Sequence, residues 1–128
     1  MITIEQLKEV KERTESLNRY LDIDGKKMQY EEEQLRTQDP GFWEDAKRAE
    51  AQMKLVKGLE KWIKGYAAVE TLASELETAY EFFREELVSE AEVDELYARA
   101  LTALEDLELK NMLRREEDSM DTVLKINS

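Results

Sequence analysis

The sequence of 128 residues contains no cysteine and no histidine, and it has only one proline and four glycines. Because cysteine is absent, the chain has no disulfide framework, no thiolate zinc site and no cysteine nucleophile. Because histidine is absent, it has no Ser-His-Asp triad, no imidazole ligand and no ordinary proton shuttle at neutral pH. We therefore expect a protein that is not an enzyme, with no catalytic residues, no metal site and no cofactor.

Long apolar runs are missing as well. No stretch approaches the roughly 18 apolar residues that span a bilayer, and the first residues are too polar and acidic for a secretory signal. These features predict a cytoplasmic protein without membrane contact. The formal net charge is −12, and its long-range field repels phosphate, which disfavours nonspecific binding to nucleic acid.

What the sequence does contain is apolar residues at helical spacing. Over residues 3–36 several of them keep a seven-residue register, which predicts a stripe that faces a partner helix. The apolar residues of this segment are Ile4, Leu7, Val10, Leu17, Leu21, Met28 and Leu35. Thr3, followed by Glu5 and Gln6, favours a capping box at the start of the helix.

Two places interrupt the first part of the chain. Residues 21–25 contain a glycine and two aspartates, and each aspartate can cap a helix. This composition predicts a break or kink, with a new helix starting near Asp22 or Asp24. Residues 37–41 contain the proline and a glycine and form a predicted turn. We expect Phe42 and Trp43 to pin this turn against the helices.

Apolar residues at helical spacing predict two more long helices in the rest of the chain. One is predicted from about residue 42 or 45 to residue 86, and its apolar stripe comprises Ala46, Ala49, Met53, Val56, Ile63, Tyr66, Val69, Leu72, Leu76, Tyr80 and Phe83. The other is predicted from a capping box at residues 89–92 to about residue 117, with Val93, Leu96, Leu101, Leu104, Leu107 and Met112 inward. The predicted fold is all-α, an elongated antiparallel bundle of three to four long helices joined by short turns.

The last residues differ from the rest. Val123 and Ile126 are β-branched and the helical stripe is lost, so the tail predicts a short strand. A lone strand has no sheet to join within this chain. We expect residues 1–118 to form a helical domain. Residues 119–128 either pack as an extended tail or contribute an orphan strand that starts a following, truncated α/β domain, and we favour the second.

The 31 acidic residues invite a metal or carboxylate-pair hypothesis. The nearest candidates are Asp22 with Asp24 and the acidic runs at residues 31–33 and 116–118. None has the spacing of a calcium loop, and a di-metal site in a bundle requires histidine. We interpret them as solvated helix faces and caps.

One feature points to binding. Lysines recur at spacings of three, four and three residues, which places them on one face of the second long helix. They are Lys54, Lys57, Lys61 and Lys64. Glu50 and Glu60 precede two of them by four residues and offset part of their mutual repulsion. This stripe is either a solvated helix face or a local contact for phosphate or for an acidic protein surface.

Three segments, in their order and spacing, resemble the N-terminal helical domain of the bacterial class I peptide chain release factors, and factor 2 more than factor 1. They are RYLD at residues 19–22, DPGFWED at residues 39–45 and LELKNML at residues 107–113. The resemblance extends over essentially the whole chain and includes the predicted strand after residue 118.

The resemblance implies a function for the parent protein. The resemblance to factor 2 implies that the parent protein reads the stop codons UAA and UGA on the ribosome and triggers hydrolysis of peptidyl-tRNA, with a Ser-Pro-Phe tripeptide and a Gly-Gly-Gln loop. Neither motif occurs in this sequence, whose only proline is Pro40. The family therefore implies a non-catalytic domain that binds the large-subunit stalk base, with ribosomal protein L11 and its rRNA as partners and release factor 3 nearby. We expect the fragment to be a monomer.

Two other interpretations remain open from the residues. The apolar stripes also fit a free-standing helical coiled-coil adaptor that oligomerises, which predicts a concentration-dependent dimer. A helical regulatory domain of an unrelated enzyme is the other alternative.

Overall fold

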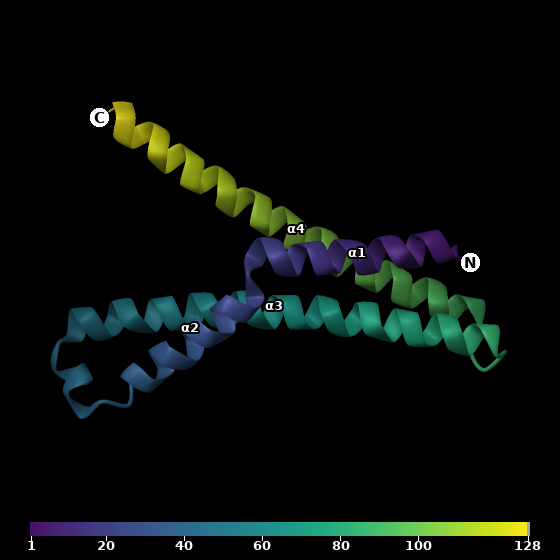
Figure 1. Ribbon diagram of the computed structural model, residues 1–128, viewed down its shortest axis with the longest axis horizontal. Helices are drawn as coiled ribbons and strands as arrows, with labels where there is room; N and C mark the ends of the chain where they lie inside the picture. Colours follow the sequence, from purple (N-terminus) through teal and green to yellow (C-terminus); the bar gives the residue numbers. More distant parts are fainter. Residues whose placement is uncertain (128) are drawn as a thin grey trace. The chain divides into compact units, whose positions relative to one another are not determined.

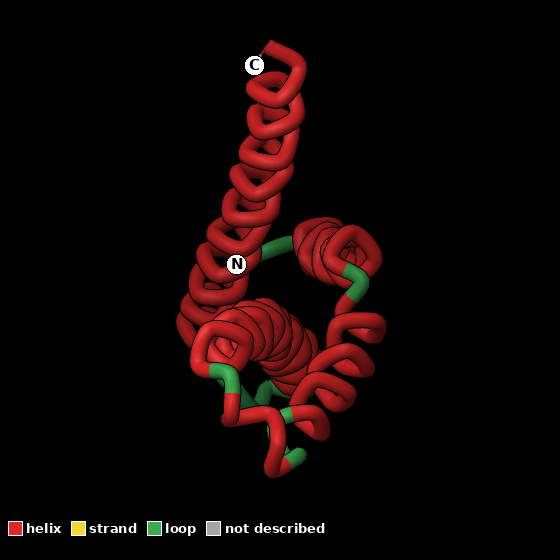
Figure 2. The backbone as a smooth tube through the Cα atoms, turned by 90° about the vertical axis from the view of Figure 1, so that its left-hand side faces the viewer, coloured by secondary structure: helices red, strands yellow, loops and turns green. Residues whose placement is uncertain are grey.

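The computed structural model describes the backbone of residues 1–127 and the side chains of residues 1–116. Four α-helices follow one another along the chain: α1 (Ile4–Leu21), α2 (Ile23–Arg36), α3 (Ala46–Arg84) and α4 (Glu90–Asn127). A short 3-10 helix, η1 (Pro40–Glu44), lies between α2 and α3. Figures 1 and 2 show helices and connecting loops with no strand in the described part of the chain. The all-α class is therefore confirmed.

The orphan strand predicted at residues 119–128 is wrong as far as residue 127, because helix α4 continues to Asn127. An isolated strand leaves its backbone N–H and C=O groups without partners, whereas a helix satisfies them within its own segment. The β-propensity of Val123 and Ile126 is weak compared with this requirement. Ser128 lies outside the described residues.

The chain divides into two compact units, and unit 1 comprises Met1–Leu17 and Val69–Ser128. Its parts of α1 and α4 run in the same direction and its part of α3 runs opposite to both (Figure 1). Ion pairs support this arrangement. The N-terminal amino group lies 3.3 Å from Asp94 Oδ2, and Arg13 pairs with Glu108 fourteen residues further along α4. Lys11 Nζ lies 3.0 Å from Glu77 Oε1 and joins α1 to α3.

The core of unit 1 includes much of the predicted inward faces of the three helical segments, together with Ile2, Ala73, Ala79 and Ala100, which were not predicted to be inward. Its buried apolar side chains are Ile2, Leu7, Val10, Leu17, Val69, Ala73, Leu76, Ala79, Val93, Ala100, Leu104 and Leu107. Ile4 and Met112, both predicted to be inward, are 43% and 56% exposed. Asn111 takes the inward position near the end of the predicted α4 stripe and is buried.

The ends of these helices use the predicted caps. Thr3 Oγ1 accepts a hydrogen bond from the Gln6 amide (3.1 Å) and Gln6 Oε1 accepts one from the Thr3 amide (2.8 Å), which is a complete capping box. Ser89 Oγ accepts a hydrogen bond from the Glu92 amide at the start of α4. Both helix starts are therefore fixed by residues close to them in sequence.

Helix α3 ends in a Schellman motif that contains no glycine. The Leu87 amide bonds to the Phe82 carbonyl (2.8 Å) and the Glu86 amide bonds to the Phe83 carbonyl (2.9 Å). Glu86 occupies the left-handed position of this motif, with φ at 66°. A residue with a Cβ is strained there and glycine is not.

We expect Glu86→Gly to stabilise the protein by about 1 kcal/mol, because glycine relieves the left-handed strain at the end of α3. The measurement is the midpoint of urea denaturation followed by circular dichroism. Glu85→Gly is the matched control, because Glu85 has no positive φ and a glycine there only adds unfolded-state entropy. A lower midpoint for Glu86→Gly than for the unmodified chain would contradict the strain assignment.

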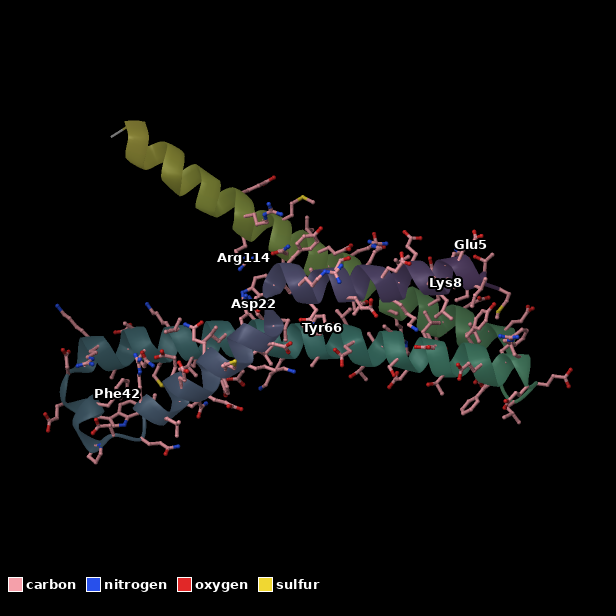
Figure 3. All side chains as sticks on the ribbon, viewed as in Figure 1. Glu5, Lys8, Asp22, Phe42, Tyr66 and Arg114 are labelled. Carbon is pink, nitrogen blue, oxygen red and sulfur yellow. The ribbon has the colours of Figure 1, made fainter. Side chains whose placement is uncertain are left out.

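Unit 2 comprises Asn18–Ala68 and contains the helix break and the α2–α3 hairpin. Asp22 adopts a left-handed conformation (φ 49°, ψ 58°), and its side chain accepts a hydrogen bond from the Gly25 amide (3.3 Å). Figure 3 labels Asp22 at the junction of α1 and α2. The predicted break is therefore confirmed, with Asp22 as the residue that caps α2.

The break changes which side of α2 faces inward. Leu21 and Ile23 are almost fully buried, but Met28 and Leu35 are each 65% exposed. The prediction that Met28 and Leu35 continue the buried stripe of α1 is therefore wrong. The left-handed residue Asp22 interrupts the helical phase, so a seven-residue register that crosses it no longer marks one face.

The tip of the hairpin is held by hydrogen bonds more than by burial. Asp39 Oδ1 accepts a hydrogen bond from the Gly41 amide (3.0 Å) at the start of η1. Trp43 donates its indole N–H to the Thr37 carbonyl (3.0 Å) and meets the Phe42 ring edge to face, although it is 56% exposed. Trp43 therefore fixes the turn through a polar contact within it, and the expectation that Trp43 packs against the helices is wrong.

Candidate nucleic-acid interface

The four lysines predicted as a stripe lie on the part of α3 that belongs to unit 2. We call Lys54, Lys57, Lys61 and Lys64 the lysine face, and all four are exposed. Lys54 and Lys64 are ten positions apart, about 15 Å along the helix axis at about 1.5 Å per residue. The opposite side of this segment carries the buried residues Val56, Leu59 and Tyr66. Packing of that side thus leaves the lysine face in solvent.

Two of the four lysines make ion pairs with the glutamates expected from the sequence. Lys54 Nζ lies 3.7 Å from Glu50 Oε1, and Lys64 pairs with Glu60. The hydrogen bond to the Glu60 carboxylate, together with the charge of that group, raises the pKa of Lys64. Lys64 therefore keeps its proton at neutral pH.

The other two lysines carry no such partner. Among the described residues, neither Lys57 nor Lys61 makes an ion pair within 4.0 Å. Exposed i,i+4 pairs such as Glu50–Lys54 contribute little and exchange easily with a new anion. The whole lysine face can therefore bind an anionic partner, with Lys57 and Lys61 available without any rearrangement.

The local charge is opposite to that of the chain as a whole. Residues 46–68 contain six basic and two acidic side chains, within a protein of net charge −12. Outside its own stretch of helix, no atom lies within 4 Å of the position that a Cβ would take on Gly58, which follows Lys57. The helix surface at Gly58 is therefore open to solvent.

The residues that carry the family resemblance have structural roles. Asp22 caps α2, Asp39 caps η1, and Trp43 fixes the turn. Among the described side chains there is no cluster of three or more metal-ligating residues. No helix in the described part of the chain is long and apolar enough to cross a bilayer.

Comparison with known proteins defines the family. The chain matches the PCRF domain over residues 26–128 and therefore belongs to the PCRF domain family.

Among its relatives, the chain is 36% identical to "Peptide chain release factor 2" of Tolumonas auensis and 35% identical to that of Aeromonas salmonicida. Each of these alignments covers 98% of this chain and 35% of the relative. A third relative with the same name, from Proteus mirabilis, is 33% identical. The chain thus spans about a third of the length of the relatives it matches, and the resemblance to release factor 2 is confirmed.

Proposed function

We propose that this chain is the N-terminal region of a factor that ends translation at the stop codons UAA and UGA. Membership of the PCRF domain family and the relatives named peptide chain release factor 2 support this assignment. The sequence contains neither the Ser-Pro-Phe nor the Gly-Gly-Gln motif. In this proposal the 128 residues bind, and the chemistry belongs to other parts of the factor, acting in the cytoplasm.

The proposed binding partner is the large-subunit stalk base of the ribosome, with ribosomal protein L11 and its rRNA, and release factor 3 acts nearby. The observation that carries the docking proposal is the lysine face, an exposed basic stripe on an acidic protein. The net negative charge limits nonspecific binding to RNA, while the local stripe supplies phosphate contacts. The proposal divides the chain at residue 118: residues 1–118 form the docking domain, and residues 119–128 begin the next domain.

Replacing all four lysines of the lysine face by glutamine is expected to weaken binding of the chain to bacterial ribosomes by about tenfold or more, because lost phosphate contacts also lose the entropy of counterion release. Helicity should be unchanged, because the four side chains are exposed and glutamine is a good helix former. Binding is measured by fluorescence anisotropy of the labelled chain at low ionic strength.

A second quadruple variant provides the matched control for charge. It replaces four exposed basic residues outside the lysine face by glutamine, namely Lys8, Lys27, Arg84 and Arg115. It changes the net charge by the same amount and should bind ribosomes almost as well as the unmodified chain. Equal weakening of the two variants would contradict docking through the lysine face. A chain that forms a concentration-dependent dimer and does not bind ribosomes would favour the adaptor alternative.

A further inference from the structure

The outward side of α2 carries two apolar residues that are mostly exposed to solvent. Met28 and Leu35 are each 65% exposed, and their seven-residue spacing places them in line along the helix. The opposite side of α2 supplies the buried residues Ile23 and Glu33. Apolar side chains in one line on a solvent-facing helix can bind the apolar stripe of a partner helix.

A shallow hollow, largely open to solvent, lies beside Leu35. It has a volume of about 380 Å³ and is lined by Tyr30, Glu31, Gln34 and Leu35. Gln34 Nε2 donates a hydrogen bond to the Tyr30 hydroxyl at 2.7 Å, so the polar wall of the hollow is held in place. Leu35 supplies the apolar part of this open hollow, against which an apolar side chain of a partner can pack.

Acidic side chains flank the apolar pair. Asp24, Glu31 and Glu32 are exposed, and none of the three makes an ion pair within 4.0 Å among the described residues. We call Asp24, Met28, Glu31, Glu32 and Leu35 together the α2 outer face.

These charges select the partner. The carboxylates repel the phosphates of RNA, and they repel the same face of a second copy of this chain. A partner with basic residues around an apolar stripe complements both the charge and the apolar pair.

We propose that the α2 outer face binds a basic amphipathic helix of a partner protein. An apolar stripe at positions i, i+3 or i+4, and i+7 of that helix lies along Met28 and Leu35 and covers the hollow beside Leu35. Its lysines or arginines pair with Glu31 and Glu32. Unit 2 thus offers two surfaces of opposite chemistry, and this proposal does not depend on docking through the lysine face.

The test uses the full chain and a fluorescent synthetic peptide of leucine and lysine, about 18 residues long, with the two residue types on opposite helix faces. Anisotropy titration gives the Kd. The double substitution Met28→Ser and Leu35→Ser is expected to raise the Kd about tenfold or more, because the apolar area buried on binding is lost. The matched control, Leu55→Ser with Leu109→Ser, removes exposed apolar residues elsewhere and should leave the Kd unchanged.

A second pair of variants tests the charges. Glu31→Gln with Glu32→Gln should raise the Kd about threefold to tenfold, because two exposed ion pairs are lost. Glu70→Gln with Glu75→Gln changes the net charge equally at exposed positions of α3 and should have little effect. A peptide with glutamate in place of lysine should not bind.

Several results would overturn the proposal. One is an unchanged Kd for the peptide when Met28 and Leu35 are replaced by serine. Another is equal weakening of peptide binding by the two pairs of glutamate-to-glutamine substitutions. A self-association of the chain that the serine variant abolishes would assign the face to a second copy. A short RNA that competes with the peptide for this face would also contradict the assignment to a basic protein segment.

Discussion

Leu76→Ala is expected to destabilise the protein by about 3–5 kcal/mol, because it removes a fully enclosed side chain and leaves a cavity in the core. Leu76 has 0% of its surface exposed and lies on the part of α3 that belongs to unit 1. The free energy of unfolding of a typical domain is about 5–15 kcal/mol, so this one substitution removes a large fraction of it. The measurement is urea denaturation followed by circular dichroism, because both tryptophans, Trp43 and Trp62, lie in unit 2.

The same substitution at an exposed position is the control. Leu109 lies on α4 and is 53% exposed, so Leu109→Ala should change the free energy of unfolding by about 0.5 kcal/mol or less. If the two variants lose equal stability, the side of each helix that the structure places in the core is wrong.

Gln52→Ala is expected to cost about 1.5–3 kcal/mol, because it removes a hydrogen bond to a charged group at a buried site. Gln52 on α3 donates its side-chain amide to the carboxylate of Glu33 and, at 3.3 Å, to the Glu33 carbonyl. Glu33 is only 6% exposed, so solvent cannot replace the lost donor. Arg36, at 3.5 Å from Glu33, is the ion-pair partner that remains. Thermal unfolding followed by the tryptophan fluorescence of unit 2 measures the loss.

Two comparisons separate this contact from a general effect of the substitution. Gln29→Ala changes an exposed glutamine on α2 and should be nearly neutral. The double variant Glu33→Leu with Gln52→Leu should recover most of the stability, because replacing both members of a buried polar pair by apolar groups costs little. A double variant less stable than Gln52→Ala alone would contradict this account of the contact.

The helices and their caps could be predicted from the sequence because the signals lie within a few residues of each other. The reciprocal hydrogen bonds of Thr3 and Gln6 and the cap at Asp22 depend on local geometry alone. The inward positions of Val10, Leu76 and Leu104 follow from apolar spacing within one unbroken helix.

The prediction of buried positions failed where one residue changed the helical phase. The prediction of secondary structure failed at the C-terminal end, where both a helix and a strand were compatible with the local sequence. The left-handed Asp22 redirects α2, so the periodicity that led to Met28 and Leu35 no longer applied. At the C-terminal end, local β-propensity predicted a strand, but a helix needs no partner strand. The left-handed position of Glu86 could not be foreseen either, since glycine is the usual residue there.

The lysine face was predictable as a surface because its spacing alone places four lysines on one side of a helix. Its two glutamate partners were predictable from the four-residue spacing and are confirmed. The α2 outer face was not predictable, because it exists only through the break at Asp22.

The central claim is that the lysine face contacts phosphate, and the salt dependence of ribosome binding tests it most directly. Each phosphate contact adds about 0.7–0.9 to the slope of log K against log salt concentration. Loss of four such contacts should make the slope of the variant with all four lysines of the lysine face replaced shallower by about 3–4, while the control variant should keep the slope of the unmodified chain. An unchanged slope in the lysine-face variant would contradict phosphate contact by these residues.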